Sequence, residues 1–131
     1  MIVERFFLIV SGVTGALAVA LGAFGAHGLR RYLGSIPDGA ERRAFWETAA
    51  HYHLVHALAI GLAAYLIGKS GGAGPAVIAA WCWLGGVIVF SGSLYAMTLT
   101  GLRGLGAVTP IGGLLFIAGW LFLAVAAWRL P

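Results

Sequence analysis

Seven polar side chains lie within or beside long apolar stretches of this chain and could do chemistry there. They are His27, Glu47, His51, His56, Ser91, Ser93 and Tyr95. Imidazole and carboxylate groups bind metal ions and transfer protons, and hydroxyl groups donate or accept hydrogen bonds. Because a polar group in apolar surroundings is costly unless it has a partner, we expect these side chains to gather into one polar cluster. This cluster is the candidate site, with either a ligand-binding or a structural role.

Glu47 and His51 are four residues apart, so they share one helical face and lie within reach of each other. His27 ends the preceding apolar stretch and comes to the same end of an antiparallel helix pair. Two imidazoles and one carboxylate suit zinc or iron, although the spacing differs from the HExxH pattern of zinc enzymes. His27, Glu47 and His51 therefore form either a metal site or a set of interhelical hydrogen bonds. The identity of any metal stays open.

His53 and His56 lie on roughly the opposite helical face from His51, because two residues turn a helix by about 200°. An intramembrane enzyme would use His51 or His56 as a base and Ser91 or Ser93 as the acceptor. The structural alternative is that the serines bond a backbone carbonyl of a neighbouring helix, as serines at helix contacts often do.

The elements that position these residues follow from the composition. Of 131 residues, 61% are hydrophobic and 9% are charged, against roughly a quarter charged in an average soluble domain. A soluble protein of this size cannot bury so much apolar surface. Four apolar segments, at 6–29, 44–68, 76–99 and 110–130, each reach the length of roughly 20 residues that a helix needs to cross a bilayer. The sequence predicts an all-α membrane protein with one domain, residues 1–131, whose four antiparallel transmembrane helices form a compact bundle.

Two prolines mark helix starts. Pro75 and Pro110 open the third and fourth helices, and Thr109 before Pro110 is typical of an N-cap. No proline interrupts a helix interior, so we expect straight spans. Trp46 is expected to be an aromatic anchor that lies at the lipid interface or faces lipid.

Small residues must mediate helix packing, because lipid provides no hydrophobic driving force between helices. Such residues recur at helical spacing in the first, third and fourth predicted spans. The packing residues are Ser11, Gly15, Ala18, Gly22, Gly25, Gly85, Gly86, Gly112 and Gly113.

The antiparallel order of the helices places the polar side chains in one leaflet, next to the first and third connections. These connections also carry five basic residues, Arg30, Arg31, Arg42, Arg43 and Arg103, against three at the opposite end. By the positive-inside rule we expect the first connection to be cytoplasmic and both termini to lie outside. Because the basic residues flank apolar segments, they suit lipid headgroups, and we expect no nucleic-acid partner.

Four short motifs occur in order along the chain: GAFGAHGL at 22–29, Glu47 followed by a His- and Tyr-rich helix that ends HALAIG at 56–61, FSGSLY at 90–95, and TPIGG at 109–113. In these motifs the chain resembles the small bacterial membrane proteins of domain of unknown function 423, the YgdD/YwdK-like family, with transmembrane protein 256 as the animal relative. The resemblance covers nearly the whole chain. It implies a four-span protein of the inner (plasma) membrane and no established activity.

Three functions remain open. The first is a non-enzymatic membrane protein that binds a lipid or a partner subunit through the polar cluster, alone or as a homo-oligomer, with no cofactor expected. The second is a small proton-coupled transporter, since Glu47 is the only acidic residue within a predicted span. The third is an intramembrane enzyme or metal-binding protein that uses His27, Glu47 and His51.

Overall fold

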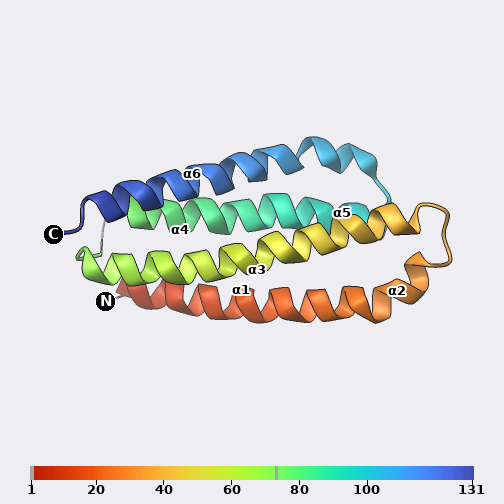
Figure 1. The fold of residues 1–131 in the computed structure, drawn as a ribbon, viewed down its shortest axis with the longest axis horizontal. Coiled ribbons are helices and arrows are strands. Elements are labelled where there is room, and N and C mark those ends of the chain that lie inside the picture. The colour runs from red at the N-terminus through yellow and green to blue at the C-terminus, as the bar shows by residue number, and fades with distance from the viewer. Residues whose placement is uncertain (1, 73) are drawn as a thin grey trace.

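The computed structural model describes residues 2–72 and 74–131, and every regular element in this part of the chain is helical (Figure 1). The elements in chain order are α1 (Ile2–Ala26), α2 (Gly28–Leu33), α3 (Gly39–Lys69), α4 (Pro75–Gly86), the π-helical turn η1 (Val87–Ser91), α5 (Gly92–Thr100), the 3-10 turn η2 (Arg103–Ala107) and α6 (Thr109–Trp128). They make up four segments that are long and apolar enough to cross a membrane: Ile2–Leu33, Gly39–Lys69, Pro75–Thr100 and Arg103–Trp128. The predicted all-α fold with four spans is confirmed.

The second and third spans lie in the middle of the molecule, and the first and fourth lie outside them. α1 packs mainly on α3, α6 packs mainly on α4, and α3 also packs on α4 and α5. In the most apolar part of each span, 50% and 44% of the residues of the second and third spans are buried, against 11% and 22% in the first and fourth. Figure 1 shows the spans side by side in the order α1, α3, α4–α5, α6. The outer faces of α1 and α6 are left for lipid.

The first connection is shorter than the sequence suggested. Helix α2 continues the first span to Leu33, and α3 begins at Gly39. Leu29 and Leu33 are buried against Trp46. The expectation that Trp46 lies at the lipid interface or faces lipid is therefore wrong: its ring is 3% exposed and fills the space between α1, α2 and α3.

Both predicted prolines lie at helix starts, but Thr109 is not an N-cap. Pro75 is the first residue of α4, and Thr109 and Pro110 are the first two residues of α6. The Thr109 hydroxyl donates back to the Leu105 carbonyl at 3.4 Å and makes no capping bond to α6. The 3-10 turn η2 ahead of α6 provides this carbonyl. The Val108 carbonyl, which follows η2, accepts the N–H of Ile111 in the first turn of α6 at 3.0 Å.

The third span is not a regular α-helix throughout. Residues 87–91 form a π-helical turn between α4 and α5, without any proline nearby. This turn carries Phe90, which packs on Gly112 of α6, and Ser91, which faces α3. A π turn accommodates one residue more than an α turn, and such turns occur frequently at functional sites.

The hydroxyl of Ser11 attaches α1 to α3 over a glycine. Ser11 Oγ donates to the Ala57 carbonyl at 2.8 Å. A Cβ atom at Gly61, one turn further along α3, would lie only 2.8 Å from this oxygen. Since a helical side chain covers the turn N-terminal to its own Cα, the absence of a side chain at Gly61 uncovers the Ala57 carbonyl for a donor from outside the helix.

Two tryptophans repeat this arrangement. Trp46 Nε1 donates to the Leu21 carbonyl at 2.8 Å, and its ring occupies the space where a Gly25 side chain would be. Trp83 Nε1 donates to the Phe116 carbonyl at 3.2 Å, and its ring lies likewise on Gly119. We call these three contacts the donor-over-glycine contacts. They join α1 to α3 twice and α4 to α6 once.

The predicted packing residues fall into two groups. Gly25 and Gly86 lie against the rings of Trp46 and Phe116, and Gly112 lies against the backbone of Phe90. An added Cβ would overlap the neighbour at each of the three positions. Of the others, Ala18 is buried. The rest are partly buried and less tightly packed: Ser11, Gly15, Gly22, Gly85 and Gly113. A Cβ at Gly22 would meet no atom within 4 Å.

We predict that Gly25→Ala destabilises the protein by about 1–3 kcal/mol, since the Trp46 ring cannot move without losing its bond to the Leu21 carbonyl. Gly22→Ala is the matched control on the same helix and has open space around it. The measurement is the midpoint of thermal aggregation in detergent. Equal midpoints for the two variants would show that the Trp46 contact does not limit stability.

Candidate functional site

The first three predicted site residues lie at the surface. His27, between α1 and α2, and Glu47 and His51, on α3, are all exposed. The Glu47 carboxylate accepts a hydrogen bond at 2.9 Å from Arg43 Nε, on its own helix. No three His, Cys, Asp or Glu side chains in residues 2–72 and 74–131 lie close enough to hold a metal ion. His27, Glu47 and His51 therefore neither form a metal-ligand set nor tie helices together.

His56 is buried, and both of its ring nitrogens are hydrogen-bonded. Nδ1 lies 2.7 Å from the Tyr52 carbonyl, which can only accept, so Nδ1 carries the proton. Nε2 is then free to accept the hydrogen bond that Trp120 Nε1 donates at 3.2 Å. The imidazole also stacks on the Phe116 ring, with 3.6 Å between centroids and 7° between planes. His56 is thus a neutral imidazole that joins α3 to α6.

His53 is the buried polar residue that sequence reasoning did not select. Its Nδ1 lies 3.0 Å from the hydroxyl of Tyr95, and its Nε2 has no hydrogen-bond partner among the described residues. Its spacing places it on one helical face with other buried residues of α3, but the structure and not the sequence shows that this face points inward. Buried residues of α3 recur at steps of three and four, at Arg42, Trp46, Ala49, His53, His56, Ile60, Ala63 and Ile67.

The serines hold the third span in place. Ser91 Oγ, fully buried, donates to the Ala49 carbonyl of α3 at 2.8 Å. Ser93 Oγ lies 2.9 Å from the Phe90 carbonyl and 2.6 Å from the hydroxyl of Thr109 in α6. Neither serine has a hydrogen bond to a histidine among the described contacts. The geometry therefore favours a structural role for these hydroxyls, in which they hold helices together, over a catalytic pair of serine nucleophile and histidine base.

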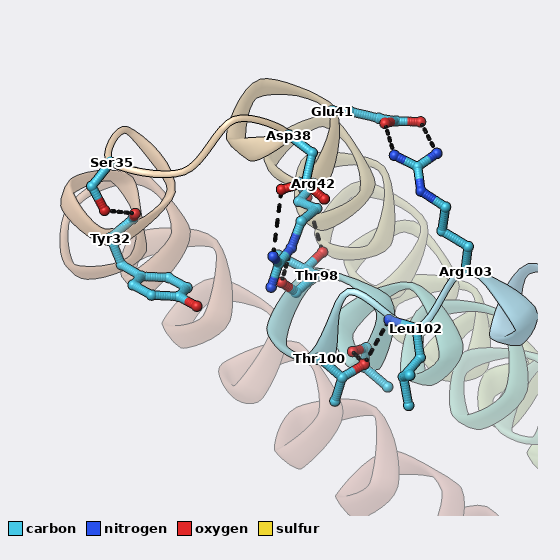
Figure 2. A network of polar contacts seen from close by, with 10 residues as sticks. Tyr32, Ser35, Asp38, Glu41, Arg42, Thr98, Thr100, Leu102 and Arg103 are labelled. Carbon is cyan, nitrogen blue, oxygen red and sulfur yellow. Dashed lines mark hydrogen bonds and ion pairs between the residues drawn. The ribbon is translucent and has the colours of Figure 1, made fainter.

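A polar network that sequence reasoning missed joins α3 to α5 near the first and third connections (Figure 2). Arg42 Nε donates to the Thr98 carbonyl at 2.8 Å, and Thr98 Oγ1 donates back to the Arg42 carbonyl at 2.9 Å. The buried guanidinium lies at the C-terminal end of α5, where the helix dipole favours a positive charge. Arg103 binds both carboxylate oxygens of Glu41 and so fastens the third connection to α3.

A groove opens between α3 and α6 beside the contact of His56 with Trp120, with a volume of about 660 Å³. Two histidines and four aromatic rings contribute to its walls, and the remaining lining is aliphatic or glycine. The lining residues are His51, Tyr52, Val55, His56, Phe90, Pro110, Gly113, Leu114, Phe116, Ile117 and Trp120. The groove includes two of the predicted site residues, His51 and His56.

We predict that Tyr95→Phe destabilises the protein by about 1–3 kcal/mol, because it leaves both His53 nitrogens buried without a partner. Adding His53→Phe to this variant removes the unpaired imidazole nitrogens. We therefore expect the double variant to regain most of the stability that Tyr95→Phe loses. Thermal midpoints of the two single variants and the double variant measure the coupling. His51→Phe, two residues away and exposed, is the control and should resemble the parent. Strictly additive effects would contradict the pairing.

Comparison with known proteins agrees with this architecture. The family described as "Protein of unknown function (DUF423)" matches residues 21–113. UPF0382 membrane protein YwdK of Bacillus subtilis is 43% identical over 123 residues, which cover 94% of this chain and 96% of the relative. UPF0382 membrane protein SH2409 of Staphylococcus haemolyticus is 42% identical, over 95% of this chain and 97% of the relative.

A further relative is UPF0382 inner membrane protein YgdD of Escherichia coli, 38% identical over 97% of this chain and 92% of its own length. No solved structure matches. The family match covers most of the chain, the relatives are named as membrane proteins, and four helices are long and apolar enough to span a bilayer. This chain is therefore an integral membrane protein that belongs to the DUF423 (UPF0382) family.

Proposed function

We propose that this protein is a non-enzymatic membrane protein that binds a lipid in the groove between α3 and α6. The observation that carries the proposal is the groove itself, open at the side of the helices and lined mostly by apolar side chains. Its volume of about 660 Å³ lies within the range of roughly 300–1,000 Å³ that small-molecule sites occupy.

The length of the groove supports a lipid as the occupant. Along α6 it extends from Pro110 to Trp120, a rise of about 15 Å. Because α6 has 20 residues, it matches a hydrocarbon layer of about 30 Å, and Trp120 lies near the middle of that layer. The groove therefore covers the depth of one leaflet, which an acyl or isoprenoid chain of a lipid from that leaflet would follow.

The two alternative functions receive less support. Glu47 lies in the third turn of α3, exposed and paired with Arg43, whereas a coupling carboxylate would be expected deep in a span. An enzyme would need a base within hydrogen-bond reach of an acceptor, and the two serines are bonded to carbonyls and to Thr109.

We predict that Gly113→Leu reduces the lipid retained by the purified protein, because the longer side chain extends into the groove. A Cβ at this position is tolerated, since it would meet the Phe90 ring only at 3.9 Å. Gly12→Leu, on the exposed side of α1 with no atom within 4 Å of an added Cβ, is the matched control.

Lipids that co-purify from native membranes are identified and counted by mass spectrometry. A lipid enriched in the parent and in Gly12→Leu, and depleted in Gly113→Leu, supports the proposal. The same lipid complement in all three proteins would refute it.

We further propose that the first connection faces the cytoplasm, since the end of the molecule with the first and third connections carries five of the eight basic residues. In a Cys82→Ala background, which removes the single cysteine, Ser35→Cys and Ser70→Cys place a thiol in the first and second connections. A membrane-impermeant maleimide on intact cells stripped of their outer layers should label position 70 alone. Labelling of position 35 before permeabilisation would reverse the orientation.

A further inference from the structure

We propose that the lipid bound in this groove carries a planar ring with hydrogen-bond acceptors, as a membrane quinone does. This inference rests on the proposed function, since it names the class of molecule that the same groove holds. It concerns binding only and involves no electron transfer.

The first support is a stack of nearly parallel rings in the groove wall. The planes of His56 and Phe116 differ by 7°. The Tyr52 ring lies 6.0 Å from each of them and is inclined by only 9° and 15°. Three rings thus share one orientation at the groove. A planar ring can extend such a stack through offset contacts, which a flexible acyl chain cannot do.

The second support is a hydroxyl without a partner. Tyr52 is 40% exposed and lines the groove, and its hydroxyl makes no hydrogen bond to any described residue. Trp120 Nε1, another donor of the lining, is already bonded to His56 at 3.2 Å. In hydrocarbon no water can satisfy the Tyr52 hydroxyl, so an acceptor on the ligand is its natural partner.

The depth of these rings within the leaflet limits how polar the bound part of the ligand can be. Phe116 lies seven residues into α6, about 10 Å from the start of the helix and therefore well inside the leaflet. A charged phospholipid headgroup would lose its hydration at this depth, whereas the weakly polar carbonyls of a neutral quinone ring would not carry that penalty. The tail then lies along the apolar remainder of the groove.

The test uses the full chain in detergent, with binding measured by native mass spectrometry titration. The probes are a decyl-tailed benzoquinone and decylcyclohexane, which has the same tail on a ring without planarity or acceptors. We expect the quinone to bind at least about tenfold more tightly. Tyr52→Phe keeps the ring stack and removes the hydroxyl, and it should weaken quinone binding about 2- to 10-fold. It should leave decylcyclohexane binding and the thermal midpoint unchanged.

Tyr65→Phe, on the other half of α3 and outside the groove, is the control for a lost exposed hydroxyl. Equal affinity for the two probes, or an unchanged quinone affinity in Tyr52→Phe, overturns the ring proposal. If Gly113→Leu still weakens both probes in that case, the groove remains a lipid site of lower selectivity. If Gly113→Leu affects neither probe, the proposed function itself fails.

Discussion

A side-chain donor placed over a glycine is the contact on which the arrangement of the four spans depends. Lipid surrounds every helix equally well, so helices associate only where close packing or a hydrogen bond distinguishes a neighbour from lipid. Ser11, Trp46 and Trp83 achieve both at once, because the glycine beneath each donor also exposes a backbone carbonyl. These contacts produce two tightly joined pairs, α1 with α3 and α4 with α6.

The groove exists where such contacts are missing. Among the described residues, the single hydrogen bond between α3 and α6 runs from Trp120 to His56. The two helices are held near each other indirectly, since Ser91 attaches the third span to α3 and Trp83 attaches it to α6. The space that remains between them is the groove, and the nearly parallel rings of Tyr52, His56 and Phe116 lie in its wall. The groove is therefore a consequence of how the helix pairs are joined.

Length and hydropathy were sufficient to predict the four spans, because a bilayer demands continuous apolar helices. The same two properties did not predict the burial of residues at the start of α3. Arg42 and Trp46 resemble interface residues in sequence, yet both are buried, since backbone carbonyls of α5 and α1 accept their N–H groups. A hydropathy scale scores each residue alone, so it cannot account for hydrogen-bond acceptors that lie on other helices. The capping role of Thr109 failed for the same reason, since η2 provides an acceptor that the sequence does not reveal.

The candidate site was predicted only in part. Helical periodicity correctly separated His51 from His53 and His56, but it did not show which face points inward, because in a membrane helix both faces are apolar. The choice of Glu47 and His51 followed from their charge and spacing. The observed inward face follows the stripe from Arg42 to Ile67, which includes only two of the four histidines of the chain.

The π-helical turn at 87–91 has a consequence for how chains of this kind can vary in length. Inside an α-helix, loss of one residue rotates all later side chains by about 100° relative to the earlier ones. Such a rotation would separate α5 from Ala49 and Arg42 of α3. The wide turn already contains the additional residue, so a deletion there can relax to ordinary α geometry with both flanking helices in place. Single-residue insertions and deletions in this span should therefore concentrate between Val87 and Ser91, beside the groove.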